Sequence, residues 1–227
     1  MGHPSIPGDA AMTQMPAEGF VLAGGRSTRM GQDKALLLLG GRALLDLALE
    51  KLRALPLAAA PRVAASRPEL ASHGALIADL HPGCGPLSGI EAALAASSQR
   101  FNVFLPVDLP LLPSLFLLWM LERARITGAL ATIPCINGWP QPLCAVYQRE
   151  LLGPMSAALT AGDHKVMPVI RAACHPGQSL DVFDVEGVAS AQPDLFSFSP
   201  LPLYRWFHNC NTPEDMASIG NALVLTQ

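Results

Sequence analysis

Short apolar runs alternate along this chain with longer stretches in which apolar residues recur every three or four positions. Runs of the first kind predict strands, and stretches of the second kind predict helices. Strands are expected at residues 19–23, 62–66, 75–80, 101–107, 130–135, 143–147 and 207–210. Helices are expected at 42–55, 86–97, 113–128, 149–161 and 166–173, with a last helix that opens at Thr212-Pro213-Glu214-Asp215.

This alternation predicts an α/β fold, a Rossmann-like, doubly wound and mostly parallel sheet with helices on both faces. The run Phe101–Val107 is apolar on both faces, as expected in the middle of such a sheet. We expect residues 1–18 to be a poorly ordered leader, residues 19–227 to form one domain, and the Pro- and Ser-rich stretch Gly187–Pro202 to be a surface excursion. Ligands of these folds bind beyond the carboxyl ends of the strands.

Charged residues are sparse, since only 15% of the 227 residues are Asp, Glu, Lys or Arg and the net charge is −3. This balance excludes a strongly basic nucleic-acid binder and a disordered tail. The most apolar stretch, Phe101–Leu121, contains three prolines and Asp108, which argues against a membrane-spanning helix. The five cysteines form no Cys-x-x-Cys pair, which argues against a disulfide framework and structural zinc. We therefore expect a cytoplasmic protein without a membrane or nucleic-acid partner.

A glycine-rich, basic segment follows the first predicted strand. Residues 22–36 read LAGGRSTRMGQDKAL and hold Gly24, Gly25, Arg29 and Lys34. Glycines allow backbone N–H groups to approach phosphate oxygens, and the cations neutralise them. The spacing fits neither a Walker A loop nor Gly-x-Gly-x-x-Gly. A phosphate-binding loop and a tight turn with solvated charges both remain possible on these residues alone.

Two isolated carboxylates follow predicted strands. Asp108, in VDLPLLP, is the only charged residue between Phe101 and Leu121, and Asp79 lies in ADLHPGCGPLSGI. An isolated carboxylate is costly in apolar surroundings unless it is paired, hydrogen-bonded or bound to a metal. Asp108 could therefore cap a turn or helix, or it could bind Mg²⁺, which prefers one or two carboxylates together with phosphate oxygens.

The carboxyl-terminal half offers two weaker groups. Asn209 and Asn211 alternate around Cys210, so a strand at this point would direct both amides to one face. Asn211 could instead belong to a capping turn of the last helix. His164 and Lys165 form a small basic segment, for which an ordinary helix start is the alternative.

Three motifs together resemble the molybdenum cofactor guanylyltransferase (MobA) family of nucleotidyltransferases. The first, L-A-G-G-x-S-x-R-M-G-x-D-K, spans residues 22–34. The second, D-x-x-P-G-x-G-P-L-x-G, spans residues 79–89, and the third, N-x-N-T-P-E-D, spans residues 209–215. The resemblance covers roughly residues 19–224, apart from the excursion. A match of this length is too long to be a chance motif match.

The resemblance implies a nucleotide-diphospho-sugar transferase-like fold and a specific reaction. GMP would be transferred from GTP to the phosphate of molybdenum-molybdopterin, with release of pyrophosphate. Residues 19–128 would form the nucleotide-binding half and residues 129–227 the acceptor-binding half. Another cofactor-biosynthesis protein would deliver the molybdopterin substrate, and the enzyme would be a monomer or weak oligomer.

The resemblance also implies roles for individual residues. Catalytic roles fall on Lys34, Arg29 and Asp108, and Asp108 would bind Mg²⁺. Nucleotide binding falls on Leu22, Ala23, Gly24, Gly25, Lys34, Ser66, Asp79 and Asp108. Acceptor binding falls on His164, Lys165, Asn209 and Asn211. Two positions depart from the family pattern, because Val107 replaces a Cys and Ser66 replaces an Asn with longer reach.

Other functions remain open on the sequence. The nearest are a cytidylyltransferase and a sugar-phosphate nucleotidyltransferase. A different class is a catalytically silent module that only binds a nucleotide. The intact Lys34 and Asp108 argue against that module, because loss of either residue would be its expected sign.

Overall fold

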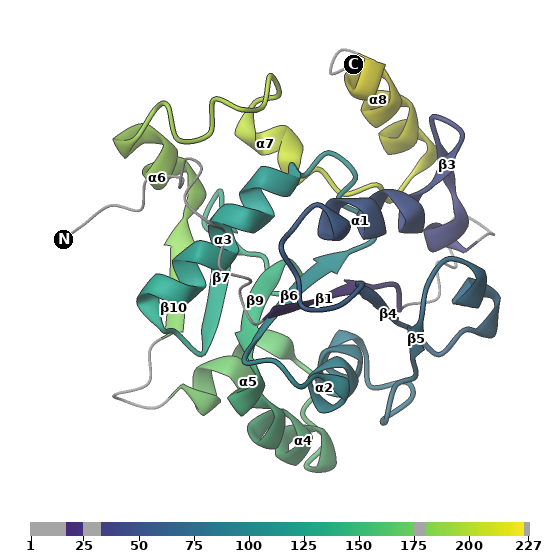
Figure 1. Ribbon diagram of the computed structural model, residues 1–227, viewed down its shortest axis with the longest axis vertical. Coiled ribbons are helices and arrows are strands. Elements are labelled where there is room, and N and C mark those ends of the chain that lie inside the picture. The colour runs from purple at the N-terminus through teal and green to yellow at the C-terminus, as the bar shows by residue number, and fades with distance from the viewer. Residues whose placement is uncertain (1–16, 25–32, 175–179, 225–227) are drawn as a thin grey trace.

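A mostly parallel sheet forms the middle layer of the computed structural model, which describes residues 17–24, 33–174 and 180–224 (Figure 1). The strand order is β10-β7-β9-β6-β1-β4-β5, with β8 paired to β7. Strand β9 runs antiparallel between β7 and β6. The sheet strands are β1 (Ala17–Leu22), β4 (Arg62–Ala64), β5 (Leu76–Ile77), β6 (Phe101–Pro106), β7 (Ala131–Ile136), β8 (Trp139–Pro140), β9 (Ala145–Gln148) and β10 (Leu180–Asp184). The predicted mostly parallel α/β sheet is confirmed.

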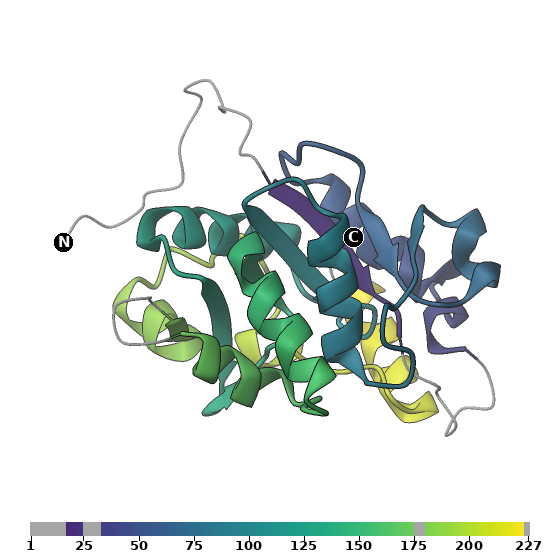
Figure 2. The same ribbon diagram turned by 90° about the horizontal axis from the view of Figure 1, so that it is seen from below.

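Helices cover both faces of this sheet. On one face lie α1 (Leu44–Arg53), α3 (Ser114–Thr127), α6 (Val185–Ala191), α7 (Leu203–Trp206) and α8 (Pro213–Val224). On the other face lie α2 (Pro86–Ala96), α4 (Leu152–Thr160) and α5 (Val166–Ala173), and these three lie in front of the sheet in Figure 2. A small hairpin of β2 (Leu38–Leu39) and β3 (Arg42–Ala43) precedes α1.

The apolar strands explain why two cores form. Along β1, Phe20 and Leu22 belong to the core beneath α2 and α4, whereas Val21 belongs to the core beneath α1 and α3. Alternate side chains of a strand point to opposite faces, so a strand that is apolar throughout is buried on both sides. Phe20 stacks on Phe104 of β6, with 5.3 Å between the ring centroids. The sheet is therefore a rigid support for the loops at its carboxyl edge.

The carboxyl-terminal region differs from the predicted elements. Phe207–Cys210 was predicted to be a strand, and this prediction is wrong, because the segment follows α7 as irregular chain. It joins the rest of the fold through one backbone hydrogen bond, from Cys210 N–H to the carbonyl of Asp108 at 2.9 Å, rather than through a ladder. Strand β10 was not predicted, because only Phe183 of its residues is buried.

The stretch 187–202 is more than the predicted surface excursion. It contains most of α6, and Phe196 within it is buried. The Phe196 ring lies 5.6 Å from that of Phe116 on α3 and 5.3 Å from that of Trp119. The rest of the stretch is exposed or half-buried, as predicted, and the aromatic anchor at Phe196 fixes it to the core.

Strand β1 begins at Ala17, so its first two residues fall inside the range expected to be a leader, and both are buried. Among the residues that the structure describes, no helix is long and apolar enough to cross a membrane.

Candidate active site

The carboxyl ends of β1, β4 and β6 lie level with one another. Leu22, the last residue of β1, pairs with Ala64 of β4 and with Pro106 of β6. The residues that follow these strands therefore emerge side by side at one edge of the sheet. They include Ala23, Ser66 and Asp108 of the predicted site.

Lys34, Asp108 and Asn211 meet at this edge. The Lys34 ammonium donates to Asp108 Oδ2 at 2.8 Å and also to the side-chain oxygen of Asn211. The side chains of Lys34 and Asp108 are 16% and 24% exposed, so the ion pair is largely shielded from water. An ammonium has three donors, and these contacts with described residues use two of them. The structure thus brings together three predicted residues from distant parts of the chain.

Arg67 and Asp33 were not predicted as site residues. The Arg67 guanidinium forms an ion pair with Asp33 and donates to the backbone carbonyl of Ala23. Asp33 Oδ1 in turn accepts from Ala35 N–H at 2.9 Å, which caps the short 3-10 helix Lys34–Leu36. Asp33 precedes the predicted Lys34, and Arg67 follows the predicted Ser66. No sequence motif indicates that Arg67 pairs with Asp33.

Asp79 and Ser66 also lie at this edge. Ser66 Oγ accepts from the backbone N–H of Asp79 at 2.8 Å, so Ser66 orders the turn that carries the carboxylate. Asp79 Oδ1 lies 3.5 Å from the position that a Cβ on Gly89 would take, and Leu22 and Ala64 surround the same point. Desolvation in these surroundings raises the pKa of Asp79.

A capping network orients Asn211. Asp215 Oδ2 accepts from the backbone N–H groups of Asn211 and Thr212, each at 2.9 Å, and Asp215 Oδ1 lies 3.2 Å from His208 Nε2. Thr212 Oγ1 accepts from Asp215 N–H at 3.1 Å, which closes the cap of α8. These hydrogen bonds lower the pKa of Asp215 to about 2, with the Asn211 N–H as the largest cause.

Asn209 and Asn211 share the exposed side of their segment, and Cys210 between them is buried. This alternation was predicted, although the segment is not a strand. Both residues are exposed, and Asn211 contributes its backbone N–H to the cap of α8 and its side-chain oxygen to Lys34.

The remaining predicted residues have weaker support. His164 and Lys165 are exposed in the connection between α4 and α5. Because β9 runs antiparallel, α4 starts at the opposite edge of the sheet and returns the chain to the carboxyl edge, where this connection lies. Gly24 is exposed, and a Cβ there would meet no described atom within 4 Å. The predicted Gly25 and Arg29 lie outside the described residues.

The carboxylates fit a metal only in combination with a substrate. The described residues contain no group of three or more His, Cys, Asp and Glu side chains that could hold a metal ion. Among the described residues, Asp108 supplies the carboxylate that pairs with the Lys34 ammonium. Such a donor suits Mg²⁺, which completes its octahedron with phosphate oxygens and water.

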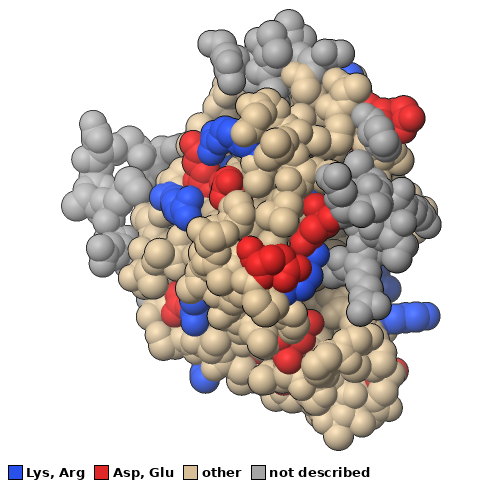
Figure 3. All heavy atoms as spheres, turned by 90° about the vertical axis from the view of Figure 1, so that its right-hand side faces the viewer, with Lys and Arg blue, Asp and Glu red and all other residues tan. Residues whose placement is uncertain are grey.

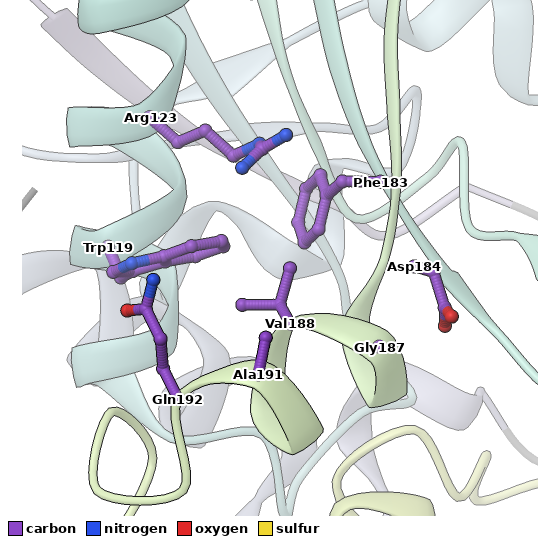
Figure 4. Close-up of a pocket in the computed structure, with 8 residues that line it drawn as sticks. All are labelled: Trp119, Arg123, Phe183, Asp184, Gly187, Val188, Ala191 and Gln192. Carbon is purple, nitrogen blue, oxygen red and sulfur yellow. The ribbon is translucent and has the colours of Figure 1, made fainter. Parts of the chain in front are cut away.

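The surface carries scattered charges, and a hollow lies outside the candidate site. On the side of the molecule seen in Figure 3, acidic and basic side chains are scattered over a mostly uncharged surface. A hollow of about 470 Å³ lies away from the candidate site, between α3, β10 and α6 (Figure 4). Arg123 forms part of its wall, where it is paired with Asp181 at 2.7 Å and lies over the Phe183 ring. These contacts give that wall a structural role.

Comparisons with known proteins show the family to which the chain belongs. Residues 19–178 match a family described as the MobA-like NTP transferase domain. The chain is 35% identical over 210 residues to a molybdenum cofactor guanylyltransferase of Xanthomonas euvesicatoria, covering 91% of this chain and 95% of that protein. It is 31% identical to a probable molybdenum cofactor guanylyltransferase of Methanothermobacter thermautotrophicus, covering 86% of this chain and 95% of the relative.

Solved structures show the same fold. Molybdopterin-guanine dinucleotide biosynthesis protein A of Archaeoglobus fulgidus superposes with a TM-score of 0.72 at 23% identity, covering 92% of this chain and 99% of its own. The 2-C-methyl-D-erythritol 4-phosphate cytidylyltransferase of Thermus thermophilus gives a TM-score of 0.62 at 17% identity, over 93% of this chain and all of its own. The predicted nucleotide-diphospho-sugar transferase-like fold is confirmed.

Proposed function

Because the chain belongs to the family of the MobA-like NTP transferase domain, we propose that it transfers GMP from GTP to the phosphate of molybdenum-molybdopterin and releases pyrophosphate. The observation that carries the proposal is that Lys34 binds both Asp108 and Asn211 at the sheet edge. The first two residues supply the charges that nucleotidyl transfer needs, and the third supplies an amide beside them. The relatives of this chain include molybdenum cofactor guanylyltransferases.

The chemistry requires little from a general base. A terminal phosphate has a second pKa of about 6, so the attacking oxygen is already anionic at neutral pH. Its lone pair forms a bond to the α-phosphorus of GTP, and the bond between that phosphorus and the bridging oxygen breaks, so that pyrophosphate leaves with the electron pair. Catalysis then depends on alignment of the two phosphates and on stabilisation of the developing charge.

Lys34 and Arg29 are the cations that we assign to this charge. The Lys34 ammonium is held by Asp108 and Asn211, and a pre-oriented cation stabilises a transition state without further reorganisation. The backbone of residues 22–25, together with Ser66 and Asp79, would bind the nucleotide. Asp79 lies at the same edge of the sheet as Ser66, which accepts from its backbone N–H, and this position supports its role near the nucleotide.

Asp108 would hold Mg²⁺, and the ion would supply positive charge to the phosphates of a bound nucleotide. The position of Asp108 two residues after β6 places the carboxylate at the sheet edge, and the Cys210 N–H donates to its backbone carbonyl. Asn209 and Asn211 would bind the molybdopterin substrate, with His164 and Lys165 as a further contact. These amides can donate to phosphate and accept from a pterin ring.

Pyrophosphate release tests the proposal. The purified chain is mixed with GTP, CTP, ATP or UTP, with and without molybdenum-molybdopterin, and with Mg²⁺ or EDTA. We expect release with GTP, only when acceptor and Mg²⁺ are both present. A faster reaction with CTP would overturn the guanine assignment, and no release with any of the four nucleotides would favour a nucleotide-binding module.

A further inference from the structure

Arg67 connects the two ends of the glycine-rich segment without belonging to it. It follows β4 and precedes the short 3-10 helix Pro68–Ser72. Its guanidinium forms an ion pair with Asp33 and donates to the carbonyl of Ala23, which lies 44 positions earlier in the chain. Ala23 and Asp33 stand on either side of residues 24–32, so one side chain sets the separation of the two flanks.

The contact with Asp33 extends to Lys34. One oxygen of the Asp33 carboxylate accepts from Ala35 N–H at 2.9 Å, and the other forms the ion pair with Arg67. The carboxylate thereby fixes the first turn of the 3-10 helix, and Lys34 is the first residue of that helix. The path from Arg67 through Asp33 therefore ends at the ammonium that binds Asp108 at 2.8 Å.

Charge gives Arg67 a second effect. Asp33 is 16% exposed and lies next to the predicted phosphate site. A carboxylate without a partner would repel the phosphates of a nucleotide and would compete for the Lys34 ammonium, because opposite charges attract strongly in poorly solvated surroundings. The Arg67 guanidinium neutralises this carboxylate and leaves Lys34 to its other partners.

We propose that Arg67 is a positioning residue for Lys34 and for the Ala23 backbone in nucleotidyl transfer. This inference rests on the proposed function. Arg67 acts through Asp33 and Ala23 rather than by contact with the reacting phosphates. Lysine cannot replace it fully, because only the planar guanidinium can reach the carboxylate and the carbonyl through different nitrogens.

A double-mutant cycle between Arg67 and Lys34 tests the proposal. A misplaced catalytic group can cost about 100-fold in rate, so Arg67→Gln is expected to lower kcat/KM for GTP by about that factor, with Arg67→Lys in between. In the Lys34→Ala background, Arg67→Gln should cost less than about threefold, because the two residues act as a unit. Full additivity of the two losses would overturn the proposal, since a separate structural role gives that result.

Two further variants separate positioning from folding. Arg67→Gln combined with Asp33→Asn removes the unpaired carboxylate and should regain part of the lost activity; no gain would contradict the charge effect. Arg62→Gln is the matched control, because Arg62 pairs with Glu18 from the other end of β4 and is equally exposed at 25%. It should leave kcat/KM within about twofold of wild type, and an equal loss at both arginines would overturn the proposal.

The same cycle distinguishes failure of the inference from failure of the proposed function. If the wild-type chain releases no pyrophosphate with molybdenum-molybdopterin, the proposed function fails. The cycle is then measured on the affinity for Mg²⁺·GTP by titration calorimetry. Non-additive losses of affinity would still support positioning by Arg67, and additive losses would contradict it.

Discussion

Lys34 is the residue on which the candidate site converges. Asp108 comes from the end of β6, Asn211 from the segment before α8, and Lys34 itself from the glycine-rich segment after β1. The sequence predicted each of these residues through motifs, but the motifs contain no information about distance. The ion pair between Lys34 and Asp108 joins residues 74 positions apart, and only the sheet order brings them together.

Replacing Lys34 with alanine tests its role. Removal of one pre-oriented group that stabilises transition-state charge typically costs about 100- to 1,000-fold in kcat, and we expect a loss in this range for Lys34→Ala. Lys34→Arg should restore only part of it, because a planar guanidinium does not place its charge where an ammonium does. Steady-state pyrophosphate release measures both, with Lys51→Ala on α1 as a control. Activity of Lys34→Ala within threefold of wild type would exclude the assigned role.

Arg67 shows what the sequence could not supply. It stands next to Ser66, which was predicted, and its charge is visible in the sequence. The positioning role that we propose for it depends on contacts with Ala23 and Asp33, and these contacts form only when the chain is folded. Side-chain pairing between distant segments has no local pattern, so a reading of motifs alone overlooks it.

Among the elements, the buried strands and long helices were the most predictable. The apolar runs at β1 and β6 and the Pro start and Gly stop of α3 define these elements by local chemistry. The strand predicted at Phe207–Cys210 failed because an apolar, alternating segment becomes a strand only when it finds a partner, and this one has a single backbone bond to Asp108. Strand β10 was missed for the opposite reason, because its residues are mostly half-buried or exposed and its partner β7 supplies the order.

Helix α3 carries the aromatic cluster that anchors the segment 187–202. The buried Phe116 ring contacts Phe196, Trp206 and Phe207, each with 5.6 Å between ring centroids. Phe116→Ala should lower the free energy of unfolding by about 3–5 kcal/mol, the usual cost of emptying a buried aromatic site. Ile126→Ala, on the same helix but 59% exposed, should change it by less than about 0.5 kcal/mol. Urea denaturation measures both, and equal effects would contradict the packing described.

The cap of α8 predicts a pH dependence. The pKa of Asp215 is about 2 in the folded chain against an ordinary value of 3.8. Its ionised form therefore stabilises the folded state above about pH 4, and this contribution disappears as the pH falls from 3.8 to about 2. Asp215→Asn should be less stable than wild type at pH 6, and the difference should shrink toward pH 2. Thermal unfolding across this range measures it, with the exposed Asp163→Asn as control; a constant difference would contradict the assignment.

At the scale of the whole molecule, the sheet joins two sets of contributions. The strands β1, β4, β5 and β6 support the residues predicted to bind the nucleotide, and the irregular chain before α8 supplies the asparagines predicted to bind the acceptor. The fold class and the family were available from the sequence, because the motifs are dense and lie at strand ends, and the roles of these residues stay predictions. The register that brings them to one edge, and the ion pairs that hold them, required the structure.

The central claim concerns the product that the chain makes. The most direct measurement is mass spectrometry of the products after the purified chain is incubated with molybdenum-molybdopterin, Mg²⁺ and equal concentrations of GTP and CTP. We predict that the guanine dinucleotide form of the cofactor accumulates together with pyrophosphate. Accumulation of the cytosine dinucleotide, or of no dinucleotide at all, would contradict the account.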